Sequence, residues 1–183
     1  FGDKFTQWHV DNLKHMIDEY SGLKYDEFEV IEDDLYGNWF NKFQMYDRFR
    51  DGENLYFDLD LVIFDRLPNL IRKDFTLLDD TWWRERAHTP LNSSIVSWTG
   101  DVSYIWDRFK ATDEAFLKVY TRGSDEWYLK FADYKTYGKV CPSIKDYLYK
   151  QPPQFGICTL GQMHHLQEKG WTGWYSNYFL KSQ

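Results

Sequence analysis

The stretch ENLYFDLDLVIFD, residues 53–65, constrains the fold more than any other part of the sequence. Its aromatic and branched apolar side chains are typical of a buried strand, yet two carboxylates, Asp58 and Asp60, stand inside it. Side chains two residues apart share one face of a strand, so both acids can project toward one place where the strand ends or bends. Charged groups are rarely buried unless they are paired or hold a metal. We therefore expect a function for this pair, rather than two solvated acids on an edge strand.

Helical and strand-like patterns alternate along the chain. Apolar residues recur at spacings of three and four over residues 6–19 and 38–49, which predicts helices, and EFEVIED (27–33) alternates as a half-buried strand does. With the strand that begins near Leu55, this order predicts an α/β fold on a mostly parallel sheet. Later patterns predict strands at 75–80, 91–98 and 155–160, and helices capped by Asp101, Thr112 and Ser124.

The length of 183 residues suits a single domain with a substantial core. The Pro-rich break YKQPPQFG (149–156) marks off a C-terminal tail, residues 150–183, which we expect to complete the functional site. No apolar run approaches the ~18 residues that a transmembrane helix needs, and no signal-like segment is present. We therefore expect no membrane span and a cytoplasmic location.

Charge and composition limit the ligands. The net charge of −7 gives no positive field for non-specific binding of nucleic acid, and nucleotide phosphates would need a bridging cation. Aromatic residues make up 20% of the chain, and they either fill the core, which is the commoner use, or offer flat faces to sugar rings and nucleobases. Two neighbouring carboxylates repel each other unless a cation neutralises them, and Mn²⁺ or Mg²⁺ prefers oxygen ligands. Asp58 and Asp60 therefore predict a site for Mn²⁺ or Mg²⁺.

Two known patterns match this aspartate pair. DLDLVIFD resembles the haloacid-dehalogenase phosphotransferase motif, in which Asp58 would be the nucleophile and Asp60 a general acid. That motif usually follows the first strand of its domain and needs a downstream Ser or Thr, then a Lys, then an acidic pair, an order that this sequence lacks. The same acids match the Asp-x-Asp motif of GT-A glycosyltransferases, which holds a divalent metal on the diphosphate of a nucleotide-sugar.

The neighbouring motifs favour the second pattern. The opening FGDKFTQWHVDNL, then residues 39–67, then NSSIVSWTGDVSYIWDRF (92–109) resemble, in this order, bacterial and phage proteins of the GT-A glycosyltransferase type, and the resemblance covers about residues 1–135. It implies a Rossmann-like, three-layer α/β/α fold whose first strand this chain lacks or barely begins. It also implies transfer of a sugar from a nucleotide-sugar donor to a carbohydrate or other hydroxyl acceptor. A catalytically inactive binding or structural module of the same fold is a further alternative.

The resemblance implies a metal and diphosphate site. Asp60 would ligate the metal directly, and Asp58 would contact the metal or the ribose. Lys42 would offset diphosphate charge, with a solvated helix lysine as the alternative. In QMHHLQEKGWTGWY (162–175), His165 or His164 would complete the metal site, with a surface histidine pair as the alternative.

The resemblance also implies a sugar site. Asn92, Ser93 and Ser94 would lie near the donor sugar or the acceptor, although Asn92 also suits an ordinary turn. GSDEWYL (123–129) resembles the Gly-Asp-Gln segment of the family, with Asp125 in place of its acid. An inverting reaction needs a carboxylate base, for which the candidates are Asp125, Asp79 and Asp80, whereas a retaining reaction needs none.

Overall fold

The computed structural model describes residues 5–36, 38–79, 89–112, 118–119, 123–141, 155–159 and 173–181. The contacts within the chain form two compact units: a first unit of Phe1–Val30, Asp58–Asn69 and Lys139–Gln183, and a second unit of Ile31–Phe57 and Leu70–Gly138. Each unit is described by itself. The expectation of one domain over residues 1–183 stays a prediction.

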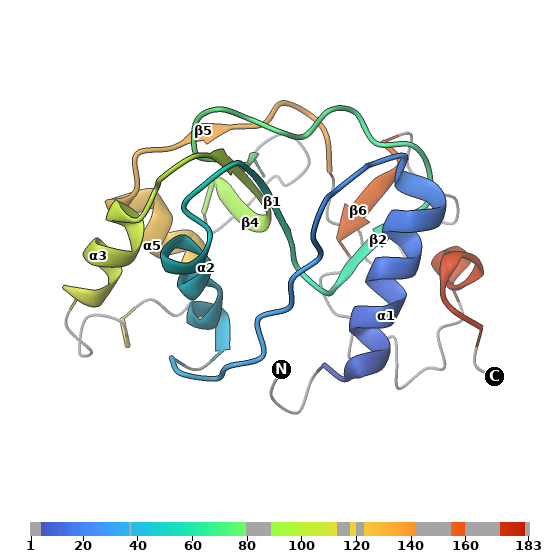
Figure 1. The fold of residues 1–183 in the computed structure, drawn as a ribbon, viewed down its shortest axis with the longest axis horizontal. Helices are drawn as coiled ribbons and strands as arrows, with labels where there is room; N and C mark the ends of the chain where they lie inside the picture. Colours follow the sequence, from blue (N-terminus) through green and yellow to red (C-terminus); the bar gives the residue numbers. More distant parts are fainter. Residues whose placement is uncertain are drawn as a thin grey trace. The chain divides into compact units, whose positions relative to one another are not determined.

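The first unit combines the N-terminal helix with a two-stranded antiparallel sheet. Figure 1 shows α1 beside strand β2, whose three residues are all buried. The Leu180 N–H donates to the Asn12 Oδ1 atom at 2.9 Å, which ties the C-terminal tail to α1. The elements of this unit are α1 (Gln7–Met16), η2 (Ile17–Ser21), β2 (Leu61–Ile63), β6 (Ile157–Thr159) and η4 (Trp174–Tyr178). The predicted helix over 6–19 and the strand within 155–160 are thus confirmed.

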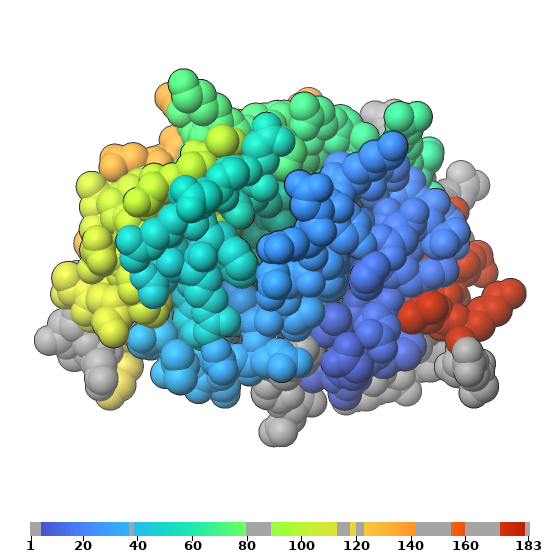
Figure 2. Space-filling model, viewed as in Figure 1, coloured from blue at the N-terminus to red at the C-terminus, as the bar shows by residue number. Residues whose placement is uncertain are grey.

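The second unit is a four-stranded sheet with a layer of helices packed on one face (Figure 1). The strand order is β1-β4-β3-β5. In the space-filling view, the cyan segment of η3 and α2 lies beside the yellow-green α3 (Figure 2). The elements are η3 (Asn38–Gln44), α2 (Met45–Arg48), β1 (Glu53–Phe57), β3 (Thr76–Asp79), β4 (Leu91–Thr99), α3 (Tyr104–Lys110), α5 (Ser124–Phe131) and β5 (Lys135–Thr136).

The predicted mostly parallel sheet is wrong, because the sheet of the second unit is mixed. β4 runs antiparallel to both β1 and β3, and only the pair of β3 and β5 is parallel. Parallel neighbours need a long crossover, usually through a helix. The chain between β3 and β5 contains α3 and α5, whereas the described part of the chain between β1 and β4 contains no helix.

The strand predicted at residues 27–33 is also wrong. Its side chains alternate between exposed and half-buried from Glu27 to Val30, as the sequence indicates. No strand of the described part of the chain pairs with this segment, so its backbone joins no ladder. Alternation predicted the burial correctly, but pairing depends on a partner that a local pattern does not reveal.

The other predicted elements are largely confirmed. Residues 38–49 are helical, although the first part is a tight 3₁₀ helix. The Ser103 N–H donates to the Asp101 Oδ1 atom at 2.7 Å before α3, and this bond holds the pKa of Asp101 below its usual value. Ser124, predicted as the cap of a helix, is instead the first residue of α5, and Gly123 stands at the cap position. The helix expected after Thr112 falls on residues outside the described part.

Aromatic side chains fill the core of the second unit, which is the commoner use of such residues. The ring of Phe43 stacks on that of Phe109 at a centroid distance of 4.4 Å and on that of Tyr128 at 4.8 Å. Trp127 meets Phe43 edge-on, also at 4.8 Å. The hydroxyls of Tyr46 and Tyr128 form a hydrogen bond of 2.7 Å with each other. No helix in the described part of the chain is long and apolar enough to cross a bilayer.

Tyr137, which follows β5, is buried in the second unit. Its hydroxyl donates to the Leu70 carbonyl oxygen at 2.5 Å, and the Arg72 guanidinium lies 5.0 Å from its ring centroid. Burial raises the pKa of Tyr137 from 10.0 to about 12, because an ionised phenolate would lose its hydration there.

We expect Tyr137→Phe to lower the free energy of unfolding at pH 7 by about 1–2 kcal/mol, because the Leu70 carbonyl loses its donor. The raised pKa stabilises the folded state fully below pH 10, and this contribution is lost as the pH rises through about 12. As the pH rises between these two values, the free energy of unfolding of the wild type should fall by on the order of 2 kcal/mol more than that of the variant. Urea unfolding at pH 7, 10 and 11.5 measures this difference, and parallel losses in both proteins would contradict it.

Candidate functional site

The two aspartates lie in a turn rather than within a strand. β1 ends at Phe57, β2 begins at Leu61, and Asp58 and Asp60 stand between them, each half-buried. The condition under which both acids can project toward one place, a strand that ends or bends at the pair, is therefore met. We call Asp58–Asp60 the aspartate turn.

The aspartate turn carries two carboxylates, which are among the oxygen ligands that Mg²⁺ and Mn²⁺ prefer. Among the described residues, no group of three or more His, Cys, Asp or Glu side chains gathers where a metal could bind. His164 and His165 lie outside the described residues. Mg²⁺ and similar ions are often bound by one or two carboxylates together with substrate phosphates and water. Two half-buried carboxylates therefore fit a metal that arrives with a diphosphate better than a metal held by protein side chains alone.

A large bulge in β4 shapes a second group of polar side chains. Leu77 of β3 pairs with Val96, whereas the next residue, Leu78, pairs with Asn92, so residues 93–95 of β4 have no counterpart on β3. Side chains alternate along a regular strand, and a bulge shifts this alternation. As a result, Leu91 faces the same helix-covered core as Val96.

The bulge presents Ser93 to the helix layer of the second unit. Both the backbone N–H and the hydroxyl of Ser93 donate to Asp125 Oδ1, at 2.9 and 2.6 Å. The hydroxyl also lies 3.0 Å from the Ser124 hydroxyl. Lys42 Nζ donates to the Ser93 carbonyl oxygen at 3.0 Å and to its hydroxyl at 3.1 Å. We call Lys42, Ser93, Ser124 and Asp125 the Ser93 cluster.

Lys42 is not the solvated helix lysine of the alternative prediction, because only 8% of the residue is exposed. Its ammonium group lies 5.0 Å from the ring centroid of Tyr56, a distance that allows a cation–π contact. A buried charge needs partners of this kind to offset the loss of hydration. Ser93 is therefore hydrogen-bonded both to the positively charged Lys42 and to the negatively charged Asp125.

Asn92 and Ser94 flank the cluster on β4. The Ser94 N–H donates to Asn92 Oδ1 at 2.8 Å, so the Asn92 side chain satisfies part of the bulge backbone. An asparagine in an ordinary turn makes the same kind of bond to the backbone two residues on. Contact of Asn92 and Ser94 with a sugar stays a prediction. Asp79, the alternative base, ends β3 and is half-buried, and Asp80 lies outside the described residues.

The structure thus brings together three residues that the sequence marked separately: Lys42 on η3, Ser93 on β4 and Asp125 on α5. Ser124 and Tyr56 belong to the same surroundings and were missed as site residues. The sequence pattern marked Ser124 only as a helix cap. Its position directly before the predicted site residue Asp125 could have identified it as a site residue too. Tyr56 carries no signal beyond its place in a strand.

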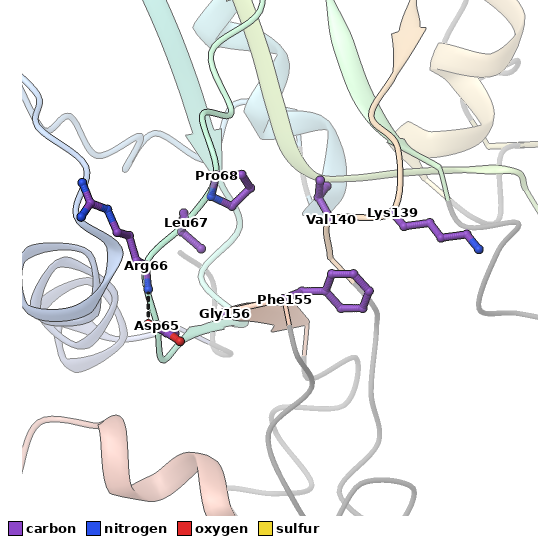
Figure 3. A pocket seen from close by; sticks show the side chains of 8 residues that line it. All are labelled: Asp65, Arg66, Leu67, Pro68, Lys139, Val140, Phe155 and Gly156. Carbon is purple, nitrogen blue, oxygen red and sulfur yellow. Dashed lines mark hydrogen bonds between the residues drawn. The ribbon is translucent and has the colours of Figure 1, made fainter.

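A cavity of about 390 Å³ lies within the first unit (Figure 3). Its lining combines apolar side chains, such as Leu67 and Phe155, with the charged residues Asp65, Arg66 and Lys139. The Arg66 N–H donates to Asp65 Oδ1 at 2.7 Å. Figure 3 shows the side chains of Arg66 and Lys139 extending away from each other, so the two cations do not converge on a common ligand atom.

No protein-family model matches this sequence, and no curated protein or solved structure shows significant similarity to the chain. The function of this chain is therefore inferred from its own residues and from the motifs that they form.

Two adjacent serines test the Ser93 cluster. We expect Ser93→Ala to lower the free energy of unfolding by about 1–3 kcal/mol, because Asp125 loses a hydroxyl donor and Lys42 loses an acceptor. Ser94→Ala is the matched control, since Ser94 is also nearly buried but its hydroxyl has no hydrogen-bond partner among the described residues. This control should cost less than about 0.5 kcal/mol. Urea denaturation compares the two variants, and equal losses would show that the cluster adds no stability.

Proposed function

We propose that this chain is a metal-dependent glycosyltransferase, which moves a sugar from a nucleotide-sugar donor to a hydroxyl acceptor. The proposal includes a GT-A-like fold, with a mixed sheet in place of the mostly parallel sheet first expected. It also includes a carbohydrate or other hydroxyl-bearing acceptor and a cytoplasmic location.

The observation that carries the proposal is the Ser93 cluster. The resemblance to GT-A glycosyltransferases names Lys42, Ser93 and Asp125 from three motifs that are far apart in the sequence. In the fold these residues form one hydrogen-bonded network. A chance resemblance of short motifs gives no reason for such convergence, so the network supports the family assignment.

The aspartate turn is assigned to the donor diphosphate. Asp60 and Asp58 would hold Mn²⁺ or Mg²⁺, with His165 or His164 as a predicted further ligand. When bound, the metal would act as a Lewis acid and stabilise the negative charge of the leaving diphosphate. The chain's own contribution is to carry two carboxylates in one half-buried turn, where water screens their charge less than it does at the surface.

The Ser93 cluster is assigned to the sugar side of the reaction. Lys42 would offset negative charge on the donor, and Asp125 would orient a sugar hydroxyl. Ser93 fixes the Asp125 carboxylate through two hydrogen bonds, which restricts the orientations that the carboxylate can take before a ligand binds. If the reaction inverts, Asp125 is also the candidate base, and a retaining reaction needs no base.

A thermal-shift experiment tests donor binding. We expect a panel of UDP-, GDP-, dTDP- and CMP-sugars with Mn²⁺ to contain at least one that raises the melting temperature, by about 5–10 °C at ~100-fold excess over the dissociation constant. EDTA or Asp60→Asn should abolish this rise, because the metal joins the diphosphate to the protein.

The matched control is Asp51→Asn, which makes the same change at an exposed aspartate ahead of β1. This variant should keep the full shift, while Asp60→Asn should lower sugar transfer about 100-fold or more. Full transfer in EDTA would overturn the metal assignment. Release of phosphate from phosphomonoesters, with a phosphorylated Asp58, would favour the phosphotransferase alternative instead.

A further inference from the structure

Trp39, at the start of η3, is unusual among the tryptophans of this protein. The residue is 51% exposed, whereas every other tryptophan in the described part of the chain is buried or half-buried. Phe40 and Phe43 of the same helix face the aromatic core, so η3 turns one large ring outward while it buries Phe43 fully and Phe40 in part. An exposed indole leaves a large apolar surface in contact with water unless a ligand covers it.

A glycine fixes the position of this indole. A Cβ atom added to Gly123 would lie 2.7 Å from Trp39 Cδ2 and 2.8 Å from Cγ, far inside normal contact distance. Gly123 also has a φ of +72°, which residues with a side chain rarely adopt. The indole therefore lies close to the backbone at Gly123, where a residue with a side chain would not fit, while half of Trp39 remains open to solvent.

Trp39 also stands next to the Ser93 cluster along two separate segments. Lys42 follows it by one turn of the 3₁₀ helix, in which side chains three residues apart lie on the same side. Gly123, which touches the indole, is followed directly by Ser124 and Asp125 of the same cluster. Lys42 and Ser124 are themselves buried, so the half-buried carboxylate of Asp125, two residues after Gly123, is the member of the cluster that stays partly open to solvent.

We propose that the Trp39 indole is a stacking platform for a neutral pyranose ring. The apolar face of a sugar covers an aromatic ring, while its hydroxyls need polar partners nearby, and Trp39 together with the half-buried Asp125 provides both. A nucleic acid is disfavoured by the net charge of −7. The inference rests on the proposed function only in that it assigns this sugar to the acceptor of the transfer reaction.

Binding of free sugars tests the platform without activity. Saturation-transfer NMR in EDTA, with the methyl glycosides of glucose, galactose, mannose and N-acetylglucosamine and with lactose and maltose, should detect at least one ligand. Trp39→Ala should lower the affinity for that ligand about tenfold or more, and Trp39→Phe should retain part of the affinity. Gly123→Ala, which displaces the indole, should weaken it as well. Leu129→Ala, at another exposed apolar residue of the second unit, is the control and should change nothing.

Three outcomes would overturn the platform. Absence of saccharide binding, or binding that Trp39→Ala leaves intact, overturns it. A dimer that Trp39→Ala converts to a monomer in sedimentation would show that a second copy of the chain covers the indole instead. A wild-type protein that binds a saccharide through Trp39 but binds none of the nucleotide-sugars with Mn²⁺ would reject the glycosyltransferase proposal alone, because saccharide binding is measured without metal.

Discussion

The hydrogen bonds between Ser93 and Asp125 are the constraint on which the polar site of the second unit depends. A bulge of three residues interrupts the ladder between β3 and β4, and such a bulge leaves backbone groups without strand partners. Buried backbone groups need other partners, and here the side chains of Asp125 and Asn92 accept the N–H groups of Ser93 and Ser94. The carboxylate that stabilises the bulge is therefore the same group that the bulge holds in place.

The aromatic core explains how a lysine can stand beside this carboxylate. Phe43 is fully buried between the rings of Phe109, Trp127 and Tyr128, which fixes η3 against the helix layer. Lys42 is the preceding residue of the same helix, so its direction follows from that packing. The cost of removing its charge from water is offset by two oxygen acceptors on Ser93 and by the face of Tyr56. Packing and electrostatics are thus coupled through two neighbouring residues.

Local patterns in the sequence predicted most of the elements, but they did not predict how the strands are arranged. The helices around Leu13, Phe43 and Ile105 and the strands around Leu77 and Val96 follow from spacing, because a helix or strand buries one face. The direction of β4 does not follow from spacing, since pairing is decided by contacts between distant segments.

The candidate site divides in the same way. Short motifs marked Lys42, Ser93 and Asp125 singly, but their meeting depends on a bulge that no residue type in β4 announces. The outward position of Trp39 was equally hidden, because nine tryptophans look alike in composition. The indole lies against the backbone of Gly123, a position far away in the sequence at which only glycine fits. The aspartate pair was the exception, since two acids in an apolar run are visible without any tertiary information.

The arrangement of the two units along the chain has a consequence for biosynthesis. The second unit is made of Ile31–Phe57 and Leu70–Gly138, so all of its strands and helices have been synthesised once Gly138 has left the ribosome. β2, in contrast, pairs with β6, which is synthesised only after the whole of the second unit. Contacts between such distant segments form slowly, because a long loop must close first. During synthesis the aspartate turn is therefore anchored through β1 before β2 has its partner, and the apolar residues of β2 must stay protected from aggregation until β6 has been made.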